Sequence, residues 1–209
     1  MGKVKIKKSD IWIDMTPMSD VMVLLLTFFM LTSTFVKQEP VKVNTPGSVS
    51  EIKVPEQNVL NILVGHDGKI FMSMDKTTDV VATLEDVTSQ FGIALTAEQQ
   101  EKFKDDPMWG VPMNELLSYL SLSKTEMPEA IKNYGIPTDS VPDKEGEAAM
   151  SEFQIWVKAA KNANPDAKIA IKADEKTPYK IVKTIMNELQ DMSENRYYLI
   201  TQYKKVEDE

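Results

Sequence analysis

The feature that most constrains this chain is an apolar stretch between Pro17 and Lys37, in which Asp20 is the only ionisable residue. About 20 apolar residues in helical conformation are enough to cross the hydrocarbon core of a bilayer, which is about 30 Å thick. The stretch therefore predicts a single transmembrane helix over residues 15–37. Because a carboxylate in such a helix costs about 2.5–3.5 kcal/mol to insert unless it faces protein or water, Asp20 is the first candidate functional residue.

The charges on either side of the stretch predict its orientation. Four lysines precede it, whereas only Lys37 and Lys42 follow it closely, with Glu39 between them. Lysine-rich flanks remain in the cytoplasm, so residues 1–14 are expected there and the rest of the chain on the far side of the membrane. A cleaved signal peptide is the competing interpretation, but the stretch is long for one, Asp20 interrupts it and no small-x-small cleavage motif follows it. The preceding lysines are Lys3, Lys5, Lys7 and Lys8.

Composition limits the chemistry of the rest of the chain. The 209 residues carry a net charge of −8 and include no cysteine, which argues against nucleic acid as a partner and excludes disulfides and thiolate metal sites. His66 is the only histidine and lies in a His-Asp-Gly turn. It offers no basis for a histidine metal site or a Ser-His-Asp triad, and no nucleophile elbow or phosphate loop is present. We therefore expect no metal, no cofactor and no enzymatic activity.

Asp20 shares one side of the predicted helix with two hydroxyl residues. The 4-3-4-3 spacing of the set aligns its members along the helix. In one interpretation, Thr27 and Thr34 only bond to the backbone or to a neighbouring helix, as hydroxyls in membrane helices do. In the other, they form hydrogen bonds with a neighbouring helix or water as Asp20 changes partner. The full stripe is Asp20, Leu24, Thr27, Leu31 and Thr34.

Residues 38–58 predict a flexible linker. Proline, glycine and serine recur in this segment, and such a composition does not fold alone. Within it, Val41 and Val43 alternate with Lys42 and Asn44. This alternation predicts a short strand available for recruitment by a neighbouring sheet.

The remaining chain predicts an α+β domain over residues 59–203, followed by a charged tail at 204–209. Two apolar stretches flank Gly65-His66-Asp67-Gly68, which indicates a β-hairpin. Apolar periodicity predicts helices and strands after it, in an order that puts helices on one face of a small mixed sheet. The expected strands are 59–64, 69–74, 168–174 and 196–202, and the expected helices are 83–91, 151–162 and 178–192.

A helical insertion is expected within this domain over residues 92–150. Thr96-Ala97-Glu98-Gln99 has the pattern of a capping box at a helix start. Two more short helices are predicted over 114–122 and 124–134. Trp109 lies between two prolines, and we expect it to fill the core of the insertion rather than to hold a ligand.

Two motifs together resemble the ExbD/TolR family of biopolymer transport proteins. The first is Asp14-Met-Thr-Pro-Met-Ser-Asp20-Val-Met-Val-Leu-Leu25 at the start of the apolar stretch. The second is Lys168-Ile-Ala-Ile-Lys-Ala-Asp174 followed by Thr177-Pro178-Tyr179. The resemblance implies a homodimer in the bacterial inner membrane, with its helices inside a ring of ExbB- or TolQ-like subunits and its domain in the periplasm. In that family, the aspartate of the helix couples the proton motive force to a TonB- or TolA-like protein.

The resemblance also assigns roles to individual residues. Asp20 matches the proton-carrying aspartate. The segment that resembles the family's linker strand has Thr45 where leucine is usual, and residues 92–150 have no counterpart in the short members. The residues of the entry motif are Asp14, Thr16 and Pro17, and those of the linker strand include Val41, Val43 and Pro46.

Two classes of function follow from the sequence. The first is a subunit of a proton-driven energy-transducing complex, for TonB-linked uptake, Tol-type envelope maintenance or another motor. The second is a membrane-tethered binding module, in which the 59–203 domain recognises peptidoglycan or an envelope protein. The first predicts that Asp20→Asn abolishes proton-dependent work, and the second predicts that a plain Leu/Ala helix can replace the span.

Overall fold

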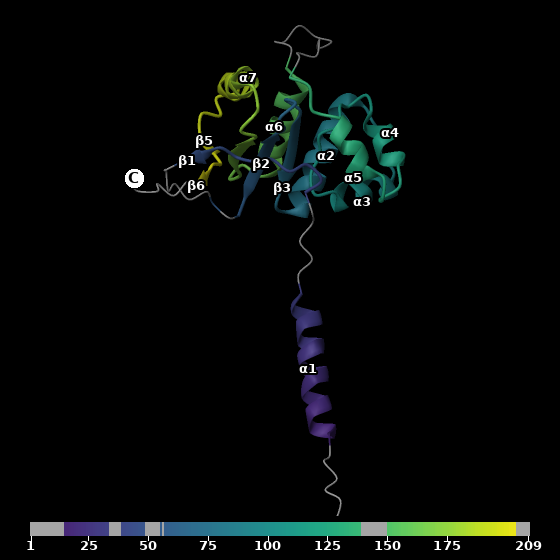
Figure 1. The fold of residues 1–209 in the computed structure, drawn as a ribbon. Helices are drawn as coiled ribbons and strands as arrows, with labels where there is room; N and C mark the ends of the chain where they lie inside the picture. Colours follow the sequence, from purple (N-terminus) through teal and green to yellow (C-terminus); the bar gives the residue numbers. More distant parts are fainter. Residues whose placement is uncertain (1–14, 34–38, 49–54, 56, 139–149, 204–209) are drawn as a thin grey trace, which may run out of the picture. The chain divides into compact units, whose positions relative to one another are not determined.

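The computed structural model describes residues 15–33, 39–48, 55, 57–138 and 150–203. The chain divides into two compact units, residues 1–37 and residues 38–209. Figure 1 gives the labels of their helices and strands.

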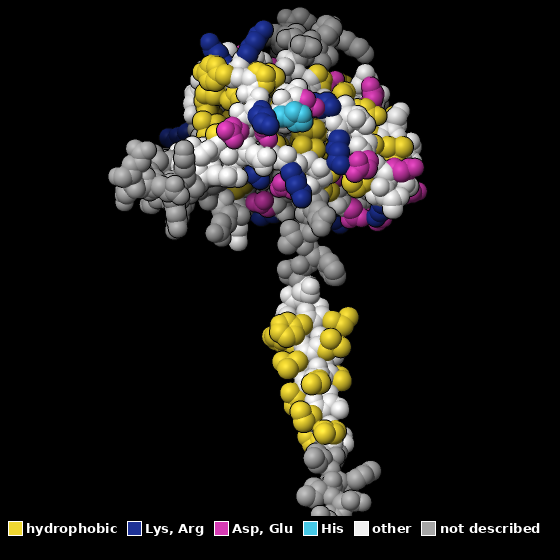
Figure 2. Space-filling model, viewed as in Figure 1, with side chains coloured by type: hydrophobic (Ala, Val, Ile, Leu, Met, Phe, Trp, Pro, Cys, Tyr) yellow, Lys and Arg dark blue, Asp and Glu magenta, His cyan; other side chains and the backbone are white. Residues whose placement is uncertain are grey.

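The first unit contains one helix, α1 (Thr16–Thr32), with Pro17 in its first turn. Proline is favoured there because it lacks only an N–H that has no partner inside the helix. None of the side chains of α1 is buried, and its surface is largely apolar (Figure 2). No helix in the described part of the chain has both the length and the apolar character required to cross a membrane, so the span over 15–37 stays a prediction.

The second unit is built on a four-stranded sheet in the order β3-β2-β4-β5. The β2–β3 pair is antiparallel, whereas β4 pairs in parallel with both β2 and β5. A separate parallel pair joins β1 (Gly47–Ser48) to β6 (Gln202–Tyr203). The predicted α+β class with a small mixed sheet is therefore confirmed. The strands of the main sheet are β2 (Val59–Val64), β3 (Ile70–Met74), β4 (Lys168–Ala173) and β5 (Tyr197–Leu199).

The hairpin between β2 and β3 forms where the sequence predicts it. Gly65 N–H donates to the carbonyl of Lys69, and Gly68 N–H donates to the carbonyl of Gly65. Gly68 has a φ of 83°, a left-handed conformation that glycine adopts at little cost. His66 is exposed in this turn.

Three longer helices complete the domain, and their boundaries differ slightly from those predicted. The largest difference is in α2, which begins six residues before the predicted start at Thr83. The extra turns bury Val80 beside Leu84 and Val87, and so extend the apolar side of the helix. The predicted last strand is divided into β5 and β6, because β6 pairs with the linker at β1 instead of the main sheet. The helices are α2 (Thr77–Phe91), α6 (Glu152–Ala163) and α7 (Tyr179–Asp191).

Short helices occupy the described part of the segment between α2 and α6. The capping box predicted at Thr96 is present: its Oγ1 accepts from Gln99 N, and its own N–H donates to Gln99 Oε1. The third predicted helix is divided into two pieces. The elements are α3 (Ala97–Asp105), α4 (Leu116–Ser121), α5 (Met127–Ala130) and the 3₁₀ turn η1 (Ile131–Asn133).

These short helices share one core with the sheet. The backbone of Trp109 pairs with Met72 at the outer edge of β3, through hydrogen bonds of 2.7 and 2.8 Å. Its indole ring lies 5.7 Å from the rings of both Phe103 and Trp156. Trp109 is buried, as predicted, but it joins the core of the whole domain, since Trp156 belongs to α6.

Candidate functional site

Asp20 is the only ionisable residue in α1 and lies in its second turn. Its carboxylate is exposed, and none of the described residues forms a hydrogen bond or an ion pair with it. The large apolar side chains of the helix are between 52% and 87% exposed. A carboxylate on an apolar helix costs free energy to remove from water unless it faces a protein partner.

The hydroxyl of Thr27 has a partner within the helix. Thr27 Oγ1 donates to the carbonyl of Leu24 at 2.9 Å, which is the backbone bonding that the first interpretation of the stripe predicts. Thr32 does the same with the carbonyl of Phe28 at 2.8 Å. The structure places Thr16 and Pro17 in the first turn of α1. Asp14 and Thr34 lie outside the described residues.

The linker contacts its own domain. Val41 and Val43 are half-buried and pack against the hydrophobic core, without forming a regular strand. Thr45 is almost completely buried, at 6% exposure. The carbonyl of Pro46 accepts from Gln202 N at 3.0 Å. The residues for which the sequence predicts recruitment by a neighbour therefore contact the core of the same chain in this structure.

The carboxylate of Asp174, directly after β4, accepts a hydrogen bond from the linker. Its Oδ2 accepts from the backbone N–H of Asn44 at 2.8 Å, and the N–H of the next residue, Glu175, donates back to the carbonyl of Asn44 at 2.8 Å. Its Oδ1 accepts from Lys176 N at 3.0 Å. The backbone N–H groups of Lys176 and Asn44 lower the pKa of Asp174 below its ordinary value of 3.8, because they stabilise the ionised carboxylate.

The described domain contains a polar cavity, and no metal cluster is found among the described residues. A cavity of about 560 Å³ lies between the C-terminal end of α6 and the segment that leads into β5. No three His, Asp or Glu side chains in the described ranges are grouped closely enough to hold a metal ion. Sequence analysis missed the cavity, although Arg196, the only arginine of the chain, lines it.

Comparisons with known proteins relate these features to one family. Residues 7–204 match the family described as Biopolymer transport protein ExbD/TolR. No match was found among curated proteins or solved structures. The matched range includes α1 with Asp20, the linker and the whole described domain with its insertion. Membership implies a role in energy transduction for biopolymer transport and association with partners of the ExbB/TolQ type. Since the match covers almost the entire length, the chain belongs to the ExbD/TolR family.

Proposed function

We propose that this protein is a non-enzymatic subunit of a complex of the ExbB–ExbD or TolQ–TolR type. In this proposal, the complex uses the proton motive force across the inner membrane to act on a TonB- or TolA-like partner, and so supports transport across the outer membrane. The observation that carries the proposal is the isolation of Asp20 on an apolar helix, in a chain that belongs to the ExbD/TolR family.

The proposal treats α1 as the core of a membrane span. Its 17 residues give a length of about 26 Å at 1.5 Å per residue, which is less than the hydrocarbon core of about 30 Å, so the proposed span includes residues on either side of the helix. The sequence stays uncharged beyond the helix as far as Val36. The lysines at the start of the chain favour a cytoplasmic N-terminus, which assigns the α+β domain to the periplasm.

A carboxylate in this position works as a proton-dependent switch. When it is protonated, Asp20 is neutral and tolerates contact with lipid or an apolar helix; when it is ionised, it prefers water or a polar partner. Each charge that moves through 100 mV gains or loses about 2.3 kcal/mol. Alternate protonation from the two sides of the membrane can therefore bias the rotation of the helix among surrounding subunits.

The mechanism requires subunits other than this chain. One helix with one carboxylate offers no continuous path for protons, so multi-span subunits of the ExbB/TolQ type must supply water access on each side. We propose that two copies of the chain occupy such a ring. The domain then transmits the motion of the helix to the TonB- or TolA-like partner.

A substitution at Asp20 tests the proposal. Asp20→Asn keeps the size and polarity of the side chain but removes its titration, so we expect normal insertion and co-purification with the multi-span subunit, and loss of proton-dependent work to background. Asp20→Glu retains the titratable group and is expected to keep part of the activity. The first measurement is uptake that depends on the proton motive force, in cells whose only source of this protein is the tested variant. The second is proton flux in liposomes that contain the purified complex. Full activity of Asp20→Asn would contradict the proposal.

Replacing the helix separates this function from that of a tethered binding module. A plain Leu/Ala helix with the same flanking residues anchors the domain equally well but lacks Asp20. If the chain is only a tethered binding module, this chimera should restore growth or uptake fully. We expect it to fail even when the chimera is present in the membrane in wild-type amounts.

A further inference from the structure

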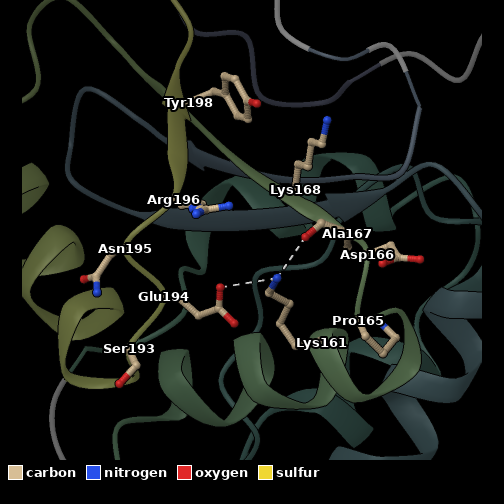
Figure 3. A pocket seen from close by; sticks show the side chains of 10 residues that line it. All are labelled: Lys161, Pro165, Asp166, Ala167, Lys168, Ser193, Glu194, Asn195, Arg196 and Tyr198. Carbon is tan, nitrogen blue, oxygen red and sulfur yellow. Dashed lines mark hydrogen bonds and ion pairs between the residues drawn. The ribbon is translucent and has the colours of Figure 1, made fainter.

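A polar cavity in the described domain is lined by residues outside the linker and the insertion. One wall comes from the end of α6 and the start of β4, and the other comes from the segment between α7 and β5. Its volume of about 560 Å³ falls within the range of small-ligand sites, which is about 300–1,000 Å³. Figure 3 shows the residues that line it: Lys161, Pro165, Asp166, Ala167, Lys168, Ser193, Glu194, Asn195, Arg196 and Tyr198.

Arg196 is the only arginine among the 24 lysine and arginine residues of the chain. Figure 3 shows its guanidinium pointing from the start of β5 toward the start of β4. It makes no ion pair with any described residue. Arginine differs from lysine in presenting a planar fork of donors that matches the two oxygens of a carboxylate or phosphate.

Lys168 places a second cation beside Arg196. The strands β4 and β5 are parallel, with Ile169 opposite Tyr197, so the residues immediately before this pair, Lys168 and Arg196, lie side by side. Like charges on neighbouring strands repel each other, and no ion pair with a described residue offsets this repulsion. Both residues are exposed, and together they give this side of the cavity a positive charge that favours an anion.

The other charges of the cavity leave this preference largely intact. Lys161 Nζ lies 3.3 Å from Glu194 Oε2 and donates to the carbonyl of Ala167 at 3.0 Å, so this lysine and this glutamate neutralise each other. Asp166 is exposed and lines the cavity as its one remaining carboxylate. Lys168 and Arg196 thus outnumber it in a chain whose net charge is −8.

We propose that this cavity binds a small oxyanion, a carboxylate or a phosphate, with the Arg196 guanidinium as the bidentate donor and Lys168 as the second cation. Ser193, Asn195 and Tyr198 line the same space and offer neutral donors for the remaining oxygen atoms. The site is independent of Asp20 and of proton coupling. The anion can be free in solution or carried by a lipid headgroup, and both sources offer the same chemistry.

The single arginine makes a direct test possible. The full chain, labelled with ¹⁵N and purified in a non-ionic maltoside, has one arginine Nε–Hε signal, which Arg196→Lys identifies by its disappearance. Inorganic phosphate and acetate are titrated at constant ionic strength, with sodium chloride as the balancing salt. We expect this signal to move saturably with phosphate or acetate, with a Kd of about 1 mM or tighter. A shift that chloride reproduces equally, or that never saturates, overturns the proposal.

Variants distinguish bidentate hydrogen bonding by the Arg196 guanidinium from the effect of positive charge alone. Lys168→Gln is expected to weaken binding about tenfold, as the loss of one charged hydrogen bond does. Arg196→Lys, followed by isothermal titration, keeps the charge but removes the fork and is expected to weaken binding by a similar factor. Lys183→Gln removes an exposed lysine of α7 that is not part of the cavity and is expected to leave the Kd unchanged. If all three variants bind as the wild type does, there is no oxyanion site here.

A second titration distinguishes the sources of the anion. Phosphatidylglycerol, added to the maltoside micelles, presents the phosphate on a lipid headgroup. A headgroup site is identified if the lipid shifts the Arg196 signal more than free phosphate does, and if this shift is lost in Lys168→Gln. An effect of free phosphate alone identifies a soluble ligand. No response to phosphate, acetate or the lipid overturns the proposal.

Discussion

Helix α1 and the insertion that contains α3 to α5 differ in how far their side chains are buried. In α1, no side chain is buried and Asp20 lacks a partner among the described residues. In the insertion, Phe103, Trp109 and Tyr119 are all at most 5% exposed. The insertion therefore packs its large side chains into the core of its own domain, whereas the side chains of α1 remain exposed. The comparison agrees with the proposal that α1 works among other subunits, and it shows that the described part of the insertion packs into the core of the domain.

The insertion also closes one edge of the sheet. Trp109 pairs with Met72 on the free side of β3, and Ile136 N donates to the carbonyl of Ile70 on the same strand at 2.9 Å. An unpaired edge invites the addition of another strand. Partners that add a strand to this domain are therefore excluded from the β3 edge along these residues.

Removing the central ring of the insertion should have the largest effect on stability. Trp109→Ala leaves a cavity between Phe103 and Trp156, and substitutions of this kind cost about 3–5 kcal/mol. We expect the urea midpoint of the domain to fall accordingly, measured by tryptophan fluorescence and circular dichroism. The matched control is Leu31→Ala in α1, where the side chain is 87% exposed, and this control should leave the transition unchanged. Equal midpoints for both variants would show that the insertion does not support the domain.

Packing beside Trp109 can be tested by adding a single methyl group. A Cβ at Gly110 would clash with the ring of Phe71 and lie 3.1 Å from the carbonyl of Ile70. Phe71 is 1% exposed and has little room to move, so Gly110→Ala should cost about 1–3 kcal/mol. Gly92→Ala meets no atom within 4 Å and should cost only the strain of its φ of 65°, about 1 kcal/mol. Thermal unfolding should therefore rank Gly110→Ala below Gly92→Ala.

The sequence predicts local features of this fold better than contacts between distant segments. The hairpin and the capping box at Thr96 depend on neighbouring residues, and both are found. The split of the last strand and the pairing of Trp109 with β3 depend on segments far apart in the chain, which periodicity does not reveal. For the site, Asp20 is identified from the sequence as the only ionisable residue of an apolar stretch. Its proton-coupling role remains a prediction, because only a partner complex can reveal it.

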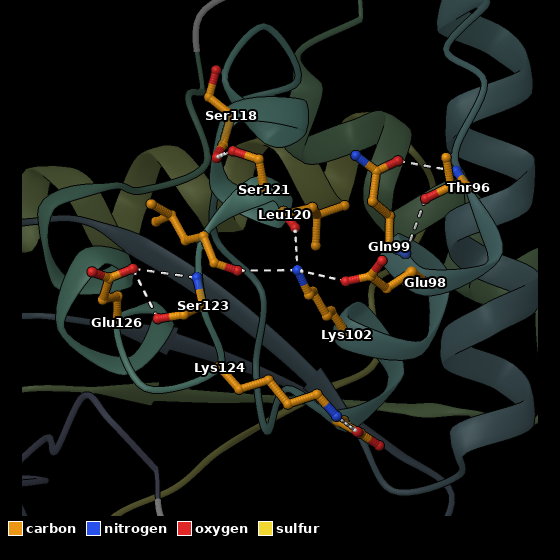
Figure 4. Close-up of polar contacts among 12 residues, drawn as sticks. Thr96, Glu98, Gln99, Lys102, Ser118, Leu120, Ser121, Ser123, Lys124 and Glu126 are labelled. Carbon is orange, nitrogen blue, oxygen red and sulfur yellow. Dashed lines mark hydrogen bonds and ion pairs between the residues drawn. The ribbon is translucent and has the colours of Figure 1, made fainter.

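A half-buried lysine should contribute less than either packing change. Lys102 Nζ donates to the carbonyls of Leu120 and Leu122 at 3.3 and 3.2 Å and lies 3.2 Å from Glu98 Oε1 (Figure 4). These bonds join α3 to the C-terminal end of α4. Lys102→Met keeps the apolar stem but removes the donors, so we expect a loss of about 1 kcal/mol. Lys158→Met, at an exposed position of α6, is the control, and a hydrogen-exchange comparison should show faster exchange in α4 only for the first variant.

The smallest effect concerns the linker and should leave the rest of the domain unchanged. Asp174 accepts from the N–H of Asn44, a residue 130 positions away in the chain. Asp174→Ala removes this acceptor, so we expect the amide of Asn44 to exchange severalfold faster, with no change in the urea midpoint. Glu175→Gln is the matched control, since only the backbone N–H of Glu175 contacts Asn44. Equal exchange in both variants would show that Asp174 does not hold the linker.

The pH dependence of this contact has a defined sign. The pKa of Asp174 is lower in the folded domain than its ordinary value of 3.8, so ionisation favours the docked linker above that value, and the contribution is lost as pH falls through the lowered pKa. Protection of the Asn44 amide from hydrogen exchange should therefore persist from neutral pH to about 4 and decline at more acidic pH. In Asp174→Ala, this amide should show no decline of its own over the same pH range. Equal declines in the wild type and in Asp174→Ala would show that the Asp174 carboxylate does not control this protection.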